Sequence, residues 1–279
     1  MKKRKCLIYV VAYNHEKFIL KTLNRIPSKI YKKYNLEILV SDDFSLDNTL
    51  LEAKKFRKKK INIISHFKNQ GYGGNQKIGY FYAIKKNFYH VVLLHGDGQY
   101  APEYLPKILK ELDNKENDAV FGSRMLSKGS ALKGGMPLYK FIGNKILTYI
   151  QNLILKANLS EFHSGYRAYK VSALKNILFE LNSNDYCFDT EIIIQLILSK
   201  FKIKEVSIPT FYGDEISYVN GLKYAFQIVF ATLKSKLHFH GIINVLKFSK
   251  VNNNKMKKLK KKQQLFLNKI FKKSNYIKL

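Results

Sequence analysis

The chain has 279 residues, 46% of them hydrophobic and only five of them Pro, which excludes a disordered chain and allows a sizeable buried core. Its 50 basic and 20 acidic residues give a net charge of +30. Half of this excess lies in residues 216–279, which contain fifteen Lys and no Asp or Glu. Such a basic end suggests a polyanionic partner, either nucleic acid or an anionic membrane surface, although a Lys-rich genome composition explains it equally well.

Cysteine usage and hydropathy bear on the compartment. Cys6 and Cys187 are far apart, each in an apolar setting, so we expect no disulfide and a reducing cytoplasm. The charged N-terminus leads into an apolar run that is too short for a signal peptide. The longest apolar segments, around 146–155 and 224–233, are well below the roughly 18 residues that a membrane span needs, so we expect no spanning helix.

Short apolar runs alternate with helical patterns as far as residue 211. In chain order, the expected strands are 6–12, 36–41, 61–65, 91–95 and 119–121, and the segment 206–211 closes the globular part. The expected helices lie near 18–26, 102–112, 138–156 and 188–197, with two others ending near residues 57 and 87. This alternation predicts an α/β fold with a mostly parallel sheet flanked by helices. Ligands of such sheets bind at the carboxyl ends of the strands.

The C-terminal part follows a different pattern. Apolar positions recur at helical spacing in 219–237 and again in 242–248, which predicts two amphipathic helices before a Lys-rich run. We therefore expect a globular domain at 1–215, amphipathic helices within 216–250 and a basic tail at 251–279. Amphipathic helices beside a polybasic run can lie on an anionic leaflet, each Lys contributing about 1 kcal/mol. The chain is thus predicted to attach peripherally at the inner face of the cell membrane.

The most informative stretch is VVLLHGDGQY at 91–100, a buried-strand pattern that ends in a Gly-rich polar turn. His95, Asp97 and Gln99 leave this strand at every second position, so they could reach one divalent cation. Carboxylate oxygen suits Mg²⁺ or Mn²⁺, and an imidazole shifts the preference toward Mn²⁺. A cation here would offset the charge that builds on a departing nucleoside diphosphate.

Polar residues follow two further strands. Tyr13 and Asn14 come after the first strand, and Asp42 and Asp43 come after the second. The two acids could simply cap the next helix. Together with Asp97, these strand ends could instead form one crevice for a base, a ribose and a diphosphate.

Cations and acids further along the chain are candidates for phosphate binding and proton transfer. Arg124, Lys133 and Arg167 lie in or beside expected loops and could grip phosphate, Arg with a bidentate fork, unless they are solvated surface charges. Asp189 and Glu191 lie near the start of a helix, and their role could be limited to complementing the helix dipole. If the protein transfers a group to a hydroxyl, one of these two acids could be the general base that removes the hydroxyl proton.

Glycine patterns argue against two nucleotide-binding classes. No Gly-Lys-Ser/Thr follows the glycines of 71–74, so a P-loop is not indicated. After the first strand, Ala12-Tyr13-Asn14 stands where a dinucleotide-binding fingerprint would begin. P-loop kinases and nicotinamide enzymes are therefore disfavoured.

In order, these segments resemble the family-2 glycosyltransferases of the Rossmann-like GT-A fold, in particular the dolichyl- or polyprenyl-phosphate sugar synthases. The likeness spans about residues 6–235. It is carried by the segments VVAYNHE, VSDDFSLDNT, NQGYGGNQKIGY, HGDGQYAPEYL, FGSR, EFHSGYRAY and FDTEI. One departure is His95, where the family motif has its first Asp, and another is Phe44, where the family has Gly.

The resemblance implies a role for each matching position. It implies that Asp97 and Gln99 hold Mn²⁺ or Mg²⁺, and His95 can ligate the same ion in place of the family's Asp. It also implies that Arg124 faces the phosphate or the acceptor. The residues implied to bind the nucleotide sugar are Ala12, Tyr13, Asn14, Asp42, Gly71 and Asn75.

The reaction implied is an inverting transfer from a nucleoside-diphosphate sugar. A polyprenyl phosphate acceptor is already anionic and needs no general base, whereas a glycan hydroxyl would need one. Two alternatives stay open: a GT-A protein whose site has decayed at His95, and a polyanion-binding protein. Nucleic acid is not expected as a partner, because no recognisable binding module is present.

Overall fold

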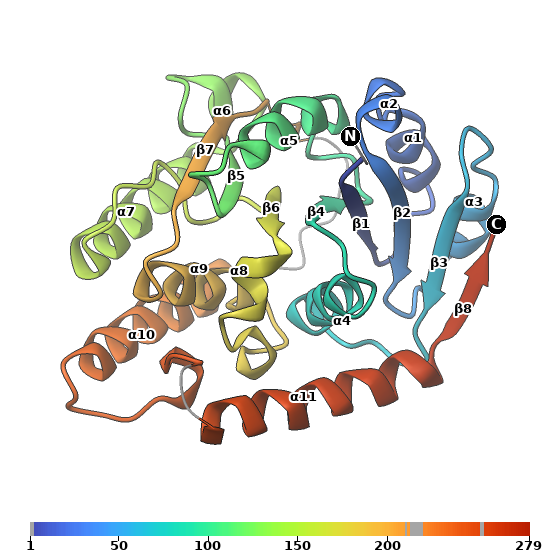
Figure 1. Ribbon diagram of the computed structural model, residues 1–279. Helices are drawn as coiled ribbons and strands as arrows, with labels where there is room; N and C mark the ends of the chain where they lie inside the picture. The colour runs from blue at the N-terminus through green and yellow to red at the C-terminus, as the bar shows by residue number, and fades with distance from the viewer. Residues whose placement is uncertain (1–2, 210, 213–219, 252–253) are drawn as a thin grey trace.

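The computed structural model describes residues 3–209, 211–212, 220–251 and 254–279. Within them, eight strands form one sheet with helices on both faces (Figure 1). The strands are β1 Lys5–Ala12, β2 Asn35–Asp42, β3 Ile61–Ser65, β4 His90–His95, β5 Ala119–Ser123, β6 Arg167–Lys170, β7 Ile203–Ser207 and β8 Asn275–Lys278. The helices are α1 Ile19–Asn24, α2 Lys29–Lys33, α3 Thr49–Lys54, α4 Tyr72–Lys85, α5 Leu105–Asp113, α6 Ser130–Lys133, α7 Leu138–Leu155, α8 Val171–Lys175, α9 Phe188–Leu198, α10 Gly221–Phe239 and α11 Asn254–Lys273.

The strand order is β7-β5-β6-β4-β1-β2-β3-β8. Strand β1 is parallel to β2 and β4, β2 is parallel to β3, and β5 is parallel to β7. Strands β6 and β8 run antiparallel to their neighbours. The predicted α/β fold with a mostly parallel sheet is confirmed. Both antiparallel strands are additions to the predicted set, and so is β7, which ends at Ser207.

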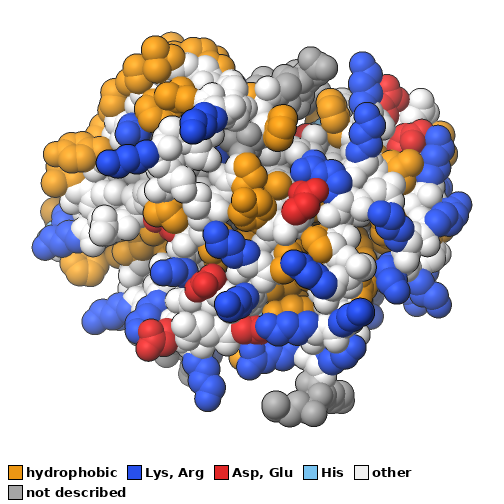
Figure 2. Space-filling view, turned by 90° about the horizontal axis from the view of Figure 1, so that it is seen from above, with side chains coloured by type: hydrophobic (Ala, Val, Ile, Leu, Met, Phe, Trp, Pro, Cys, Tyr) orange, Lys and Arg blue, Asp and Glu red, His pale blue; other side chains and the backbone are white. Residues whose placement is uncertain are grey.

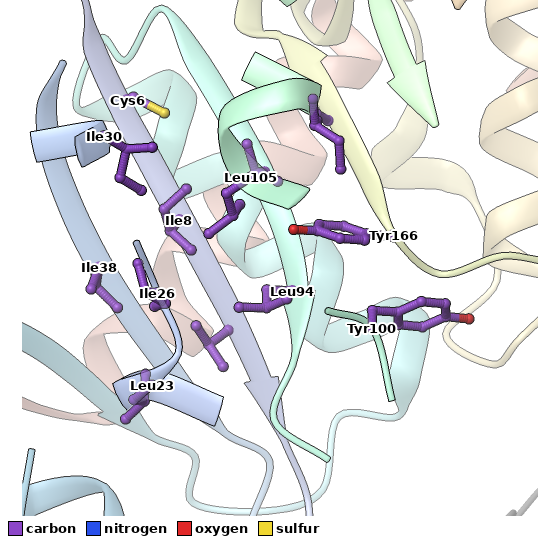
Figure 3. Packing of buried hydrophobic residues seen from close by; sticks show 14 of the residues in the cluster. Cys6, Ile8, Leu23, Ile26, Ile30, Ile38, Leu94, Tyr100, Leu105 and Tyr166 are labelled. Carbon is purple, nitrogen blue, oxygen red and sulfur yellow. The ribbon is translucent and has the colours of Figure 1, made fainter. Parts of the chain in front are cut away.

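Strand β1 explains why the sheet is buried on both faces. Side chains of a strand alternate between faces, so Cys6 and Ile8 join one hydrophobic cluster while Leu7 and Tyr9 join the other. The first cluster also contains residues of α1, α2 and α5 (Figure 3), and the second contains residues of α4, α8 and α9. A continuous apolar strand is what two covered faces require.

The C-terminal segment is part of the same globular unit and not a separate tail. Helix α11 packs along α4, where Leu267 joins Ile78 and Phe81 in a small apolar cluster. Strand β8 then pairs with β3 at the edge of the sheet (Figure 1). The prediction of a free basic tail at 251–279 is therefore wrong for its described residues, because its apolar side chains are used in packing.

Two other expectations about membranes can be compared with the fold. The predicted helix at 242–248 is reduced to a single 3-10 turn, Leu246–Phe248. Across the described part of the chain, no helix combines the length and the apolarity that crossing a bilayer demands.

Candidate functional site

A cavity of about 1580 Å³ opens where the carboxyl ends of β1, β2, β4 and β5 meet. Tyr13, Asp43, Asp97 and Arg124 each follow one of these strands, and all four line the cavity. Residues of α4, α7, α9 and α10, together with the loops between the elements, form the rest of its wall. Since the polar strand ends converge here, this central cavity is the candidate site.

The structure brings most of the predicted site residues together. The central cavity is lined by Ala12, Tyr13, Gly71, Asn75, His95, Asp97, Gln99, Arg124 and Asp189. The predicted residues that lie outside its lining are Asn14, Asp42, Lys133, Arg167 and Glu191.

The register at the strand ends decides which of two neighbouring residues faces the cavity. Asn14 has φ +56° and its Oδ1 accepts a hydrogen bond from the Leu46 N–H at 2.9 Å, so it fastens a loop. Asp42 is the last residue of β2 and is only 3% exposed, and Ser65 Oγ donates to its Oδ2 at 3.2 Å. Asp43 is the next residue along and faces the cavity, because successive side chains point to opposite faces.

Asp43 is an acid in an unusual environment. Burial, together with the nearby Asp42 charge, raises its pKa to about 7, although the Gln70 N–H opposes this by donating to Oδ1 at 2.7 Å. Phe44, which follows, adopts φ +67°, a left-handed conformation that favours glycine. Phe44 therefore holds this turn in a left-handed conformation, at a cost of about 1–2 kcal/mol.

Asn75 belongs to a buried hydrogen-bond network at the floor of the cavity. Tyr9 Oη and Ser41 Oγ each donate to Asn75 Oδ1 at 2.6 Å. His66 Nε2 lies 3.0 Å from Ser41 Oγ, and its Nδ1 lies 2.9 Å from Ser274 Oγ. The last turn before β8 is thus linked to the cavity floor.

Gly71 permits a close approach at the start of α4. The carbonyl of Asn184 accepts hydrogen bonds from Gly73 N–H at 2.8 Å and Gly74 N–H at 3.2 Å. A Cβ on Gly71 would lie 2.5 Å from that carbonyl oxygen, and the residue has φ +77°. Only glycine fits both requirements.

His95 is engaged by protein side chains. Tyr72 Oη donates to Asp189 Oδ2 at 3.0 Å, because a carboxylate only accepts. The same hydroxyl lies 3.1 Å from His95 Nε2, which must therefore donate to it. Burial lowers the pKa of His95, so the ring is neutral. Nε2 therefore carries the proton and is not a metal ligand in this arrangement, so the predicted ligation by His95 would have to use Nδ1.

Asp97 is the better candidate ligand of a divalent cation. Its Oδ1 accepts the Gln99 N–H at 2.9 Å, and both residues line the cavity. His15 lies beside Asp97, and its Nδ1 is buried without a hydrogen-bond partner. Burial lowers the pKa of His15, and the charge of Asp97 opposes that effect. No set of three His, Cys, Asp or Glu side chains among the described residues could hold a metal. The donor set therefore fits a cation held by one carboxylate and completed by phosphate oxygens.

Arg124 lines the cavity but is held by a buried carboxylate. Its Nε and backbone N–H donate to Glu161 at 2.7 Å, and Nη2 also bonds Glu161. Nη1 donates to Tyr212 Oη at 2.7 Å and Nη2 to the His163 carbonyl at 3.0 Å. The guanidinium is thereby fixed in one orientation beside the cavity.

Three predicted roles change because of where the side chains lie. Arg167 belongs to β6, is 1% exposed, and places Nε 3.6 Å from Asp189 Oδ2, so it is a buried counter-charge and not a phosphate grip. Glu191 accepts from Lys247 Nζ and from a backbone N–H, each at 2.6 Å, away from the cavity. Lys133 is exposed on α6, and Lys140 of α7 lines the cavity instead.

The cavity side chains that the sequence interpretation did not single out include His15, Tyr72 and Lys140, and it considered Asp43 without assigning it to the nucleotide. His15 and Asp43 stood in the quoted motifs, and the strand register would have identified Asp43. Nothing in the local pattern around Lys140 distinguishes it from other lysines of an amphipathic helix.

Comparison with known proteins gives one family. The glycosyl transferase family 2 model matches residues 7–178. An uncharacterised protein of Methanocaldococcus jannaschii is 33% identical over 236 residues, covering 84% of this chain and 93% of that protein. The UDP-N-acetylglucosamine--dolichyl-phosphate N-acetylglucosaminyltransferase of Methanococcus voltae is 30% identical over 249 residues, covering 83% and 96%.

A solved structure supports the same fold. Glucosyl-3-phosphoglycerate synthase from Mycobacterium tuberculosis, in complex with Mn²⁺, UDP-glucose and glycerol 3-phosphate, gives a TM-score of 0.60 at 14% identity. The match covers 86% of this chain and 82% of that one. At this identity the likeness concerns the fold alone.

Proposed function

The chain belongs to glycosyl transferase family 2, and we propose that it transfers a sugar from a nucleoside diphosphate to a polyprenyl phosphate, with inversion at the anomeric carbon. One observation carries this proposal. The central cavity has a polar end at Asp43 and Asp97 and an apolar rim that includes Ile146 and Leu222. A nucleotide suits the first end and a lipid chain suits the second.

The donor would lie at the strand ends. Tyr13 and Asp43 line the part of the wall that follows β1 and β2, where a base and ribose could bind. Asp97, next to His15, would hold Mn²⁺ or Mg²⁺ at the diphosphate. When bound, this cation would offset the negative charge on the departing nucleoside diphosphate.

The acceptor would approach from α7 and α10. Arg124, oriented by Glu161, and Lys140 supply positive charge for a phosphate. One phosphate oxygen would form a bond to the anomeric carbon as the bond to the diphosphate breaks, and the diphosphate would leave with that electron pair. No proton needs to be removed, because the acceptor is already anionic. This fits Asp189, whose oxygens are hydrogen-bonded by Tyr72 and Gln76.

The dolichyl phosphate in the name of the Methanococcus voltae relative supports the same acceptor class. A transfer assay tests the proposal: the full chain is incubated with Mn²⁺, a radiolabelled sugar donor and polyprenyl phosphate, and label is counted in the organic phase. The donors would be UDP-N-acetylglucosamine, UDP-glucose and GDP-mannose.

The matched variants are Asp97→Asn and Glu116→Gln, since Glu116 is a surface acid with a 74% exposed side chain. We expect label transfer from one donor, a loss of at least about 100-fold in Asp97→Asn, and no change in Glu116→Gln. Transfer only to soluble glycan hydroxyls, or none from any donor in a folded protein, would contradict the proposal.

A further inference from the structure

Helix α7 has its polarity reversed relative to an ordinary surface helix. The side chains buried against the protein are Asn144, Thr148 and Gln151, and both amide atoms of Gln151 are buried without a hydrogen-bond partner. The large apolar side chains that α7 exposes are Leu138, Tyr139, Ile142, Ile146, Tyr149 and Leu153. A surface helix normally buries the apolar stripe and exposes the polar one.

Helix α10 packs against α7 and has the same character. Its buried side chains are Ile228, which is apolar, and Ala231, Thr232 and Ser235, which are small or polar. Its exposed large apolar side chains are Leu222, Phe226, Phe230, Leu233, Leu237 and Phe239. We call the twelve exposed apolar side chains of the two helices the α7–α10 face. Hydrophobic side chains also gather at the left of Figure 2, the side on which α7 lies in Figure 1.

This face is continuous with the central cavity. Tyr139 and Ile146 from α7 and Leu222 from α10 belong both to the exposed apolar face and to the cavity lining. An apolar molecule that covers the face can therefore reach the cavity without crossing water.

The charges on these helices are of one sign. Neither helix contains an Asp or Glu. Their lysines are Lys140, Lys145, Lys223, Lys234 and Lys236. Exposed apolar side chains flanked by lysines match the interface of an anionic bilayer. In a two-fold dimer, the α7–α10 face would pack against the same face of a second copy. The lysines would then face one another and the cavity would be covered, so an anionic bilayer fits the face better.

We propose that the α7–α10 face docks on an anionic lipid bilayer and opens the central cavity toward it. This inference deepens the proposed function, on which its purpose rests, since a polyprenyl phosphate acceptor resides in the bilayer. It also moves the membrane contact away from the Lys-rich C-terminal segment, where Lys260 pairs with buried Glu180 and α11 packs on α4.

Vesicle flotation of the full chain, with no sugar donor present, tests this inference separately from transfer. The vesicles are phosphatidylcholine alone or mixed with phosphatidylglycerol. The test variant is Phe226→Glu with Phe230→Glu, because these side chains are 77% and 59% exposed and lie outside the cavity lining. The matched control on α11 is Leu265→Glu with Phe266→Glu, which are 57% and 58% exposed.

We expect wild type to bind the phosphatidylglycerol vesicles, the α10 variant to bind them more than about tenfold more weakly, and the α11 variant to bind like wild type. An unchanged thermal transition shows that the α10 variant is folded. The inference would be overturned if wild type did not bind the vesicles, or if the α11 variant lost as much vesicle binding as the α10 variant or more. It would also be overturned if light scattering showed a wild-type dimer that the α10 variant abolishes.

Discussion

Removing one partner of the Arg124–Glu161 pair should be one of the most destabilising single changes at the site. Glu161 is 2% exposed and Arg124 6%, so neither charge is solvated once its partner is removed. Replacing Glu161 with Ala also removes the acceptor of hydrogen bonds from the Arg124 backbone and from Asn144. Breaking a buried pair on one side costs about 3–5 kcal/mol. That is a large part of the roughly 5–15 kcal/mol that stabilises a typical domain.

The assay is urea unfolding of wild type and Glu161→Ala at pH 7, with a second variant that replaces both partners, Arg124→Met with Glu161→Leu. We expect the single variant to lose about 3–5 kcal/mol in the free energy of unfolding and the double variant to lose less, because it leaves no uncompensated charge. A loss below about 1 kcal/mol in the single variant, or an equal loss in both, would refute the reasoning.

The pH dependence of the same pair has a definite sign. Burial by itself would raise the pKa of Glu161, but the Arg124 charge and hydrogen bonds outweigh burial and the pKa is lowered in the folded state. The stabilisation is therefore complete above the unfolded pKa near 4.5 and is lost as pH falls through the folded pKa. The difference between wild type and Glu161→Ala should shrink in that acidic range.

Two further predictions concern the cavity. The folded pKa of Asp43 is raised to about 7, so between about pH 4 and 7 the folded state binds the extra proton and wild-type stability falls as pH rises. Asp43→Asn should remove this fall and be more stable than wild type at pH 8, by at most about 4 kcal/mol, while matching it near pH 4 in urea unfolding. Gly71→Ala should lose more stability than Gly129→Ala and weaken nucleotide binding in calorimetry. Both glycines have φ near +75°, but a Cβ would meet a carbonyl oxygen only at Gly71; equal losses would count against the close approach.

The sequence predicted strands β1 to β5 well because each carries an apolar run that ends in a polar or Gly-rich turn. It also located the site, because parallel strands end at one edge. It could not distinguish Asp42 from Asp43, since one residue of register reverses which side chain faces the cavity. It treated Arg167 as a loop cation because β6 is four residues long and the carboxylate that neutralises Arg167 lies on α9, at Asp189.

The C-terminal part shows a different kind of failure. Its lysines dominate the composition, which predicts a basic tail that could lie on an anionic membrane surface. The packing depends on a few apolar positions such as Leu267, and on β8, which pairs with β3 and packs Tyr276 and Ile277 against the hydrophobic clusters. The reversed polarity of α7 was equally invisible, because periodicity identifies an amphipathic helix but not which of its faces meets the protein.

A thermal-shift series with UDP, GDP, CDP and dTDP, each with and without Mn²⁺, tests the central claim most directly when it is run on wild type and Asp97→Asn. Ligand at about 100 times its dissociation constant adds about 2.7 kcal/mol, which corresponds to roughly 5 °C for a chain of this size. We predict such a shift for one nucleotide, only with Mn²⁺ and only in wild type. No shift with any nucleotide, or the same shift in Asp97→Asn, would contradict a nucleotide-sugar site built on Asp97.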